Sequence, residues 1–283
     1  MKAHGLALGP AARVSGPPHG MSPFFFGEPD ESLFGCWHAP VEHDGRSMGV
    51  VLCPPIGQEY IRAHRTFRQL AGRLARQGFH CLRFDWTGCG DSAGDDDAGR
   101  VERWRKDAGM AIDVLRDRSG VRTIAMVGLR LGAALAGLAA AERGDIETLV
   151  LWDPVIRGHA YLESLVQQHR ARMRDFPVLI TTPPAGQAPS EALGFPVSEG
   201  LRADLEGLDL STLSRRPARD ALLVETRRAA EIEPLKDPLE RLGVRVETAL
   251  IETPSMWIED INKVLVPHAV LQAVVAWLDG VAA

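Results

Sequence analysis

The chain has 283 residues, 45% of them hydrophobic and 24% charged, a composition typical of one globular α/β domain with a single large core. Its formal net charge of −5 argues against a nucleic-acid partner. The four cysteines show neither Cys-x-x-Cys spacing nor a neighbouring histidine pair, so we expect no metal site, no disulfide framework and no cofactor.

The ends and the hydropathy of the chain predict its location. No apolar stretch is long enough to cross a bilayer, and residues 1–20 lack the continuous apolar core of a signal peptide. We therefore expect a cytoplasmic protein with no membrane span. A flexible tail is expected over 1–20 and a single domain over 21–283.

Apolar runs and turn residues predict a regular succession of elements. Two apolar bursts around a Gly-Glu-Pro-Asp turn predict an antiparallel hairpin over 24–38. Strands and helices then alternate, which predicts a parallel sheet wrapped by helices. The strands are expected at 49–53, 79–84, 123–127, 148–152, 221–226 and 244–251, and the helices at 59–76, 101–116, 131–143 and 267–278.

The alternation lapses between Pro154 and Pro217. This stretch holds one helix-like segment, 161–173, and a proline-rich passage. An insertion after the sixth strand lies where a cap could cover a cleft at the carboxyl ends of the strands. We therefore expect a small cap over about 155–217, with a merely peripheral excursion as the alternative.

The most informative motif is Gly128-Leu129-Arg130-Leu131-Gly132, which lies between an apolar run and a helix of small residues. A Gly-x-Ser-x-Gly sequence in such a place forms a strained turn that exposes a serine hydroxyl above the sheet. Here Arg130 takes the place of the serine. A guanidinium only donates hydrogen bonds and cannot be deprotonated in proteins, so it cannot attack an acyl carbonyl.

Together with Asp85-Trp86-Thr87-Gly88-Cys89-Gly90-Asp91-Ser92, this motif resembles the α/β-hydrolase superfamily over about 24–278. The resemblance implies a mostly parallel eight-stranded sheet flanked by helices, and a scaffold of the esterase, thioesterase or aminopeptidase sort. The segments 53–60, 128–133 and 151–155 are similar, more narrowly, to the hydrolase 2 group associated with exosortase A gene clusters. That group also looks to carry arginine at this turn.

The resemblance further implies an oxyanion hole built from backbone N–H groups. These come from Leu131 and from either Ile56 or Gly57, with Gln58 beside them at the substrate site. Because the donors are backbone groups, the loss of a serine side chain need not remove them. The positive end of the helix that begins at Leu131 adds to their attraction for a carbonyl or anionic oxygen.

Two roles are open for the guanidinium of Arg130. It could grip a carboxylate or phosphate of a ligand, or it could form a structural ion pair with a neighbouring acid. Asp153 closes the strand expected beside that of Arg130, so its carboxylate is the expected partner. We favour the structural pair.

The remaining members of a catalytic triad are poorly represented. Glu225 lies where the acid is expected, with Asp153 as a second candidate, although a solvated loop charge or a helix cap is the alternative for either. The segment 252–266 contains no histidine. His268 follows it at the start of the closing helix, where it could act as the base, but we favour a capping or packing role.

Other side chains could replace the nucleophile. Ser92 belongs to a corner that is structural in this superfamily, and Ser255 lies in the loop where a histidine is expected. Cys53 ends a central strand, but no positive neighbour in the sequence marks it as a reactive thiolate, so we expect buried filler. Asp85 is expected to tie its own loop by hydrogen bonds to backbone N–H groups.

Three functions remain. We expect a hydrolase-fold protein that handles an acyl substrate, and whether it turns that substrate over stays open. The first function is a hydrolase or acyltransferase acting on an ester or thioester through an unusual nucleophile or an activated water, with Glu225, Asp153 or His268 as the base; the family resemblance favours this function, whereas the missing serine and histidine favour the second. The second is a degenerate binding module for a carboxylate- or phosphate-bearing ligand, and the third is a scaffold protein of a biosynthetic cluster. The expected partner is a small-molecule acyl substrate or a carrier-bound acyl thioester, and a homodimer stays an open alternative.

Overall fold

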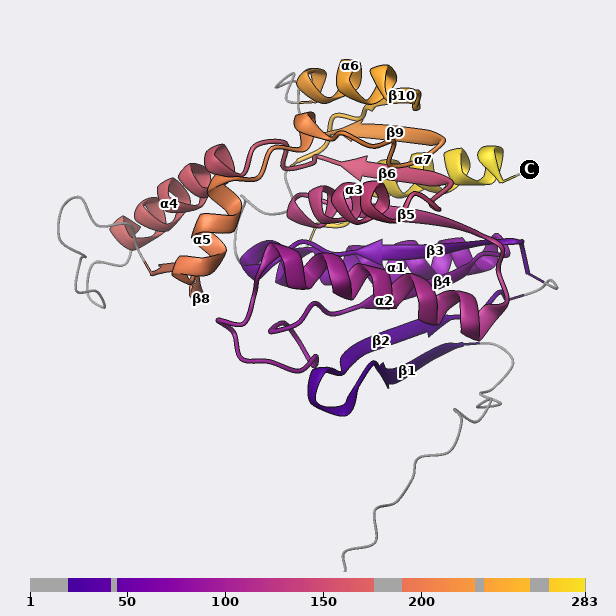
Figure 1. Cartoon of the computed structure of the whole chain (residues 1–283), viewed down its shortest axis with the longest axis horizontal. Coiled ribbons are helices and arrows are strands. Elements are labelled where there is room, and N and C mark those ends of the chain that lie inside the picture. The colour runs from indigo at the N-terminus through magenta and orange to yellow at the C-terminus, as the bar shows by residue number, and fades with distance from the viewer. Residues whose placement is uncertain (1–19, 42–44, 176–189, 227–231, 255–264, 283) are drawn as a thin grey trace, which may run out of the picture.

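The computed structural model describes residues 20–41, 45–175, 190–226, 232–254 and 265–282. Nearly all of the expected tail over 1–20 lies outside these ranges, as does Ser255. The described chain forms one twisted sheet with helices on both faces and a small group of elements projecting from one end (Figure 1).

The sheet has eight strands in the order β1-β2-β4-β3-β5-β6-β9-β10. Its first two strands form the expected hairpin and pair antiparallel, β2 is antiparallel to β4, and all other neighbours are parallel. The predicted mostly parallel eight-stranded sheet is therefore confirmed. The strands are β1 (Met21–Phe26), β2 (Leu33–His38), β3 (Met48–Cys53), β4 (His80–Phe84), β5 (Thr123–Leu129), β6 (Thr148–Trp152), β9 (Asp220–Glu225) and β10 (Arg245–Leu250).

Two separate apolar cores lie on the two faces of the sheet, so the expectation of a single core is wrong. Helices α2 (Val101–Ser119) and α3 (Leu131–Arg143) pack on one face, and α1 (Gly57–Arg76) and α7 (His268–Val281) pack on the other. Every residue of β3 and of β6 is buried, which explains why both strands appear in the sequence as unbroken apolar runs. A helix that the sequence did not predict, α6 (Glu233–Arg241), joins β9 to β10.

Between β6 and β9 the chain leaves the sheet and forms a cap, at the left of Figure 1. The cap consists of α4 (Gly158–Asp175), a hairpin of β7 (Glu191–Ala192) and β8 (Phe195–Pro196), and α5 (Glu199–Glu206). Arg100 and Asp204 join α5 to the sheet domain through two hydrogen bonds of 2.7 and 2.8 Å. Within the cap, the Leu193 N–H donates to His169 Nδ1 at 3.1 Å, which links the hairpin to α4.

His38 ends β2 in a buried position, with 7% of its surface exposed. Arg83 Nε donates to His38 Nε2 at 3.2 Å, a contact that requires the neutral imidazole. Burial, and after it the charges of Arg83 and Arg68, lower the pKa of His38 to about 4. The folded protein therefore takes up this proton much less readily than the unfolded chain does.

This difference predicts a loss of stability in acid. Because the folded pKa of His38 lies below the unfolded value of 6.5, the free energy of unfolding should fall as the pH drops from 6.5 to about 4. In His38→Gln the fall should be smaller, by up to about 3 kcal/mol, as measured by urea unfolding at several pH values. The matched control is His159→Gln, because the pKa of the exposed His159 is raised by Glu206 and not lowered. Equal acid sensitivity of the wild type and His38→Gln would contradict the assignment.

Candidate active site

Arg130 stands at the sharp turn between β5 and α3, at the carboxyl end of a central strand. Its backbone has φ 54° and ψ −123°, a conformation that residues other than glycine rarely adopt. The Arg130 N–H donates to the Trp152 carbonyl at 3.0 Å, and the Arg130 carbonyl accepts from Ala133 N and Val155 N, each at 3.1 Å. Bonds to β6, to α3 and to the chain beyond β6 thus hold the strained turn.

Two glycines allow this turn to pack closely against its neighbours. A Cβ atom on Gly132 would lie 2.2 Å from the Pro54 carbonyl oxygen, and one on Gly128 would lie 2.4 Å from Ala133 Cα. Cβ atoms do not approach backbone atoms so closely, so a larger residue at either position would push the turn away from its neighbours. The Gly-x-Arg-x-Gly motif therefore retains the backbone of a nucleophile elbow.

The guanidinium of Arg130 pairs with Glu59, which lies in the first turn of α1. Arg130 Nε donates to Glu59 Oε1 at 3.0 Å, and the Tyr161 hydroxyl of α4 donates to Glu59 Oε2 at 3.0 Å. The Tyr161 ring centroid lies 5.5 Å from Arg130 Cζ. We call these three residues the elbow cluster; it joins the central strand, the first helix and the cap.

Burial and neighbouring charges shift the pKa of Arg130 in opposite directions. Burial disfavours the charged form of Arg130, but the negative charges of Glu59 and Asp153 outweigh it and raise the pKa of Arg130. Burial and then Glu59 raise the pKa of Tyr161 well above its ordinary value. The phenol therefore keeps its proton and stays a hydrogen-bond donor to Glu59.

The expectation that the Asp153 carboxylate pairs with Arg130 is wrong. That carboxylate accepts from Thr226 N at 2.9 Å and from Thr226 Oγ1 at 2.6 Å, at the end of β9. It is the backbone carbonyl of Asp153 that accepts from Arg130 Nη1, at 3.3 Å. Asp153 has φ 40°, so the chain turns sharply where β6 ends, and its carboxylate bonds to Thr226 while its charge still acts on Arg130.

The two other triad candidates, Glu225 and His268, lie on β9 and α7. Glu225 is the last residue of β9, 9% exposed, and its carbonyl accepts from Ile251 N at 2.8 Å. His268 is exposed at the start of α7, with Nδ1 2.6 Å from Nη2 of Arg73. Arg73 follows Glu59 by 14 residues in α1, a rise of about 21 Å. His268 therefore contacts the far part of α1.

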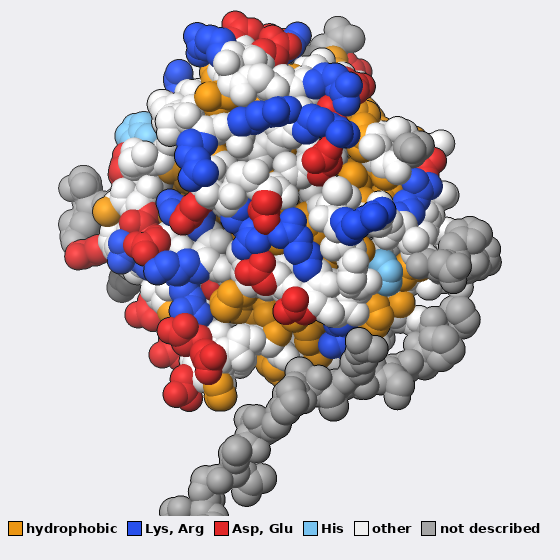
Figure 2. All heavy atoms as spheres, turned by 45° about the vertical axis from the view of Figure 1, so that its right-hand side comes forward, with side chains coloured by type: hydrophobic (Ala, Val, Ile, Leu, Met, Phe, Trp, Pro, Cys, Tyr) orange, Lys and Arg blue, Asp and Glu red, His pale blue; other side chains and the backbone are white. Residues whose placement is uncertain are grey.

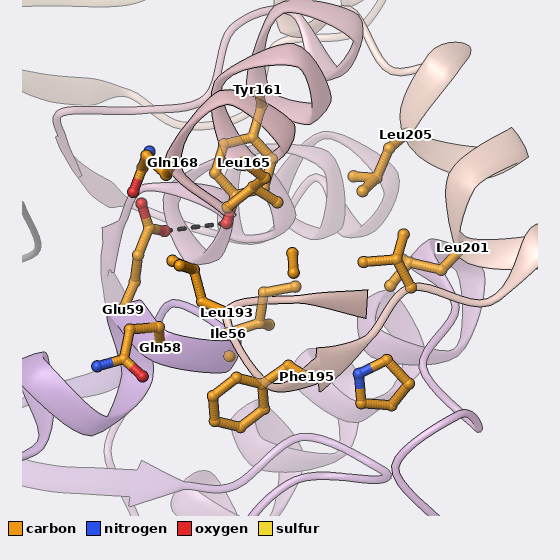
Figure 3. A pocket seen from close by; sticks show the side chains of 14 residues that line it. Ile56, Gln58, Glu59, Tyr161, Leu165, Gln168, Leu193, Phe195, Leu201 and Leu205 are labelled. Carbon is orange, nitrogen blue, oxygen red and sulfur yellow. Dashed lines mark hydrogen bonds between the residues drawn. The ribbon is translucent and has the colours of Figure 1, made fainter. Parts of the chain in front are cut away.

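A cavity lies between the cap and the first turn of α1 (Figure 3). The whole hollow measures about 490 Å³ when its part open to solvent is counted. Gln58, Glu59 and Tyr161 form its polar end, and the dashed line in Figure 3 marks the bond between Tyr161 and Glu59. Its apolar wall comes largely from the cap, with Leu165, Leu193, Phe195, Leu201 and Leu205.

Of the four residues expected at the oxyanion hole and substrate site, three line this cavity, and Leu131 is not among the residues that line it. Ile56 and Gly57 line it together with Gln58, and Phe195 of the cap hairpin covers Gly57. Leu131 begins α3, where a backbone N–H has no acceptor within its own helix. Asp153, Glu225 and His268 are not among the described residues that line the cavity.

Backbone strain concentrates at the same place. Within the described ranges, the residues other than glycine with positive φ are Arg130 at 54°, Asp153 at 40° and Leu193 at 55°. Arg130 and Asp153 end the neighbouring strands β5 and β6, and Leu193 lines the cavity. Such conformations persist where the surrounding structure fixes them, most often at binding and catalytic sites.

Ser92 has the structural role that the sequence predicted. Its hydroxyl donates to the Asp85 carbonyl at 2.6 Å and accepts from Phe34 N at 2.9 Å. The Asp85 carboxylate in turn accepts from Asp91 N at 3.2 Å and from the Tyr60 hydroxyl at 2.7 Å. Asp85 therefore ties its own loop together and also fixes it to α1.

Cys53 is fully buried, and burial raises the pKa of its thiol, so it is not a reactive thiolate. Among the residues that the structure describes, no group of three or more His, Cys, Asp or Glu side chains could hold a metal ion. Within the same ranges, no helix is both long enough and apolar enough to span a bilayer.

Sequence reasoning missed Glu59 and Tyr161. Glu59 is the one acid in α1 and directly follows Gly57 and Gln58, so its place next to the expected oxyanion loop was a usable signal. Tyr161 is one of two tyrosines in the chain, but nothing in the sequence around it indicates that α4 would bring it onto Glu59.

The sheet order, the elbow and the cap after β6 define an α/β-hydrolase fold. The sequence model of the serine aminopeptidase S33 family (Hydrolase_4) matches residues 57–223, and the chain belongs to this family. No curated protein matches the chain.

Solved structures of esterases are similar to this chain in fold. An esterase of Pyrococcus furiosus has a TM-score of 0.62 at 16% identity, with 93% of this chain and 91% of that chain covered. Est1E of Butyrivibrio proteoclasticus, with bound ferulic acid, has a TM-score of 0.64 at 16% identity over 90% and 97% of the two chains. A carboxyl esterase of Bacillus coagulans, in complex with glycerol, has a TM-score of 0.66 at 12% identity over 93% and 99%.

The buried pair predicts strong coupling between two substitutions. Glu59→Leu should destabilise the protein by about 3 to 5 kcal/mol, because it leaves the Arg130 charge buried without its carboxylate. Adding Arg130→Met should restore part of that loss, so the double variant is more stable than the sum of the single effects predicts. Denaturant unfolding of all four proteins measures the coupling, with the exposed Lys106–Glu102 pair as the control at under about 1 kcal/mol. Additive effects of Glu59→Leu and Arg130→Met would show that the pair carries no such energy.

Proposed function

We propose that this protein hydrolyses a short-chain acyl ester or thioester by direct attack of water, without an acyl-enzyme intermediate. The observation that carries the proposal is the cavity of Figure 3, which is apolar on the cap side and ends at the carboxylate of Glu59. An acyl chain fits the apolar wall, and its carbonyl would lie at the polar end next to the backbone of Gly57. The hollow measures about 490 Å³ even with its open part counted, which favours a short chain.

In this proposal Glu59 is the base. Each carboxylate oxygen has two lone pairs, so the bonds to Arg130 and Tyr161 leave acceptor capacity for a water molecule. The water oxygen bonds to the carbonyl carbon while one of its protons passes to Glu59. When the tetrahedral intermediate collapses, the ester C–O or thioester C–S bond breaks. The leaving oxygen or sulfur then takes the proton from Glu59, so the products are a carboxylic acid and an alcohol or thiol.

Arg130 supports attack by water over attack by a protein nucleophile. It fills the position where a serine hydroxyl would lie, is always charged, and makes its ion pair with Glu59. The elbow backbone remains, and the first N–H groups of α3 point away from that helix toward its N-terminal side. These groups can stabilise a carbonyl oxygen without any covalent step.

The form of the substrate, the subgroup of the family and the location of the protein are further parts of this proposal. We propose a carrier-bound acyl thioester as one form of the substrate, and membership of the hydrolase 2 group associated with exosortase A gene clusters. A cytoplasmic location fits the four cysteines, which the structure describes as free thiols.

A fluorophosphonate probe tests the absence of an activated serine. The wild-type protein should stay unlabelled in gel fluorescence or intact-mass measurements, because Arg130 occupies the elbow. Weak labelling of Arg130→Ser at its new hydroxyl would indicate that the N–H donors are in place. Labelling of the wild type at Ser92 or Ser255 would overturn the proposed mechanism.

A panel of p-nitrophenyl esters and acyl thioesters of increasing chain length tests the hydrolysis itself. We expect turnover of the shorter chains. In Glu59→Gln it should fall by about a hundredfold or more, because the variant loses the base but can keep a hydrogen bond to Tyr161. Leu165→Trp should block the cavity and abolish turnover, whereas Leu250→Trp, at an exposed position on β10, serves as the control.

A second function is favoured by one observation: both oxygens of the carboxylate proposed as the base already accept a hydrogen bond, one from Arg130 and one from Tyr161. The alternative is a binding module that holds an acyl ligand in the same cavity without turning it over. Binding of a fluorescent acyl ligand that is lost in Leu165→Trp, together with no turnover of any ester or thioester in the panel, would replace the hydrolase proposal by this one.

A further inference from the structure

The exposed side of α1 carries a row of arginines in a protein whose net charge is −5. The helix contains five arginines, and Glu59, which belongs to the elbow cluster, is its one acid. Arg65, Arg68 and Arg76 are exposed and, with Gln69, Gly72 and Arg73, line a shallow groove that follows the helix. We call Ile61, Arg65, Arg68, Gly72 and Arg76 the arginine face.

The arginines of this face differ from those on other helices. Arg100 Nε lies 2.7 Å from Asp204 Oδ2. On the face that Figure 2 draws, basic and acidic side chains lie next to each other. By contrast, the structure records no ion pair between Arg65, Arg68 or Arg76 and any carboxylate in the ranges it describes. Three like charges on one helix repel each other, so their arrangement disfavours the free protein and favours an anionic partner.

The same face presents an apolar side chain. Ile61 is 57% exposed and lies one helical turn before Arg65. Positions 61, 65, 68, 72 and 76 recur every three or four residues, so they share one side of the helix. Gly72 lies between the arginines, and a Cβ atom there would meet only Arg76 Nη1, at 3.8 Å, which leaves room for a close approach. An apolar anchor beside charged residues is typical of a protein–protein interface.

We propose that the arginine face docks an acidic helix of a partner protein, which presents the acyl group to the cavity. Arg65 and Arg76 are 11 residues apart, about 16 Å along the axis, which matches three turns of a helix with carboxylates on one side. The amino end of α1 at Gly57 lines the cavity, so a partner along α1 ends beside the acyl site. The delivery of an acyl group rests on the proposed function; the docking does not.

Other occupants fit these observations less well. One phosphate group occupies one or two guanidinium forks and leaves Ile61 without a role. A second copy of this chain, meeting the same face across a twofold axis, would bring arginines against arginines. The proposal therefore commits to an acidic protein helix, and the test includes the other sources of negative charge.

The probe is a fluorescent alanine-rich helical peptide with glutamates and one leucine on a single side, titrated with the full-length protein and followed by anisotropy. The wild type should bind it, and more weakly as salt rises. Arg65→Glu/Arg68→Glu should weaken binding by about tenfold or more, and Ile61→Ser should also weaken it. The matched control is Arg122→Glu/Arg241→Glu, which makes the same charge change at two exposed arginines elsewhere and should alter binding by less than about twofold.

Three results would overturn the proposal. In the first, the control variant weakens peptide binding as much as Arg65→Glu/Arg68→Glu does. In the second, a peptide with the same glutamates spread around the helix binds as tightly as the one-sided peptide. In the third, the protein binds anionic phosphatidylserine vesicles or pyrophosphate in place of the peptide. Hydrolysis of a free p-nitrophenyl ester separates this proposal from the proposed function. If the protein binds the peptide through its arginines but hydrolyses no ester, only the proposed hydrolase function is wrong. If it hydrolyses the ester but does not bind the peptide, only the docking proposal is wrong.

Discussion

A charged guanidinium that is nearly removed from water must have a carboxylate beside it, and this constraint organises the site. Arg130 keeps its charge because Arg130 Nε lies 3.0 Å from Glu59 Oε1, and the Tyr161 hydroxyl donates a second hydrogen bond to the same carboxylate. The three side chains come from the central strand turn, the first helix and the cap. The cap is therefore joined to the centre of the fold by the hydrogen bond from Tyr161 to Glu59, in addition to the Arg100–Asp204 pair.

The elbow keeps the backbone of a nucleophile turn, but its side chain is a different chemical group. Gly132 still permits the close approach to the end of β3, Gly128 permits the close approach to the start of α3, and the turn keeps its strained φ. What the arginine changes is the group above the sheet, from a nucleophile to a permanent cation. The proposed hydrolysis moves the reactive role to Glu59, which the cation holds in place. Helix α1 then has two roles, with Glu59 at the cavity and the arginine face toward solvent.

The hydropathy pattern of the sequence predicted those helices and strands that bury one regular face or are buried throughout. The expected ranges 148–152 and 131–143 match β6 and α3 residue for residue, because a fully buried strand and a small-residue helix have clear signals. The elements that escaped prediction are short or irregular. Helix α6 contains Pro238, and the β7–β8 hairpin has two residues in each strand, so neither presents a periodic pattern long enough to recognise.

The sequence by itself determined the sheet, the sharp turn, the presence of arginine where a serine is usual, and the lack of a histidine in 252–266, because each is a matter of residue order. Only the tertiary structure decided which acid meets that arginine. Asp153 lies 23 residues from Arg130 and ends the neighbouring strand, but its turn directs the carboxylate to Thr226. Glu59 lies 71 residues away and reaches Arg130 because α1 begins beside the same end of the sheet. The pairing of buried charges depends on backbone direction at strand ends, which local sequence does not encode.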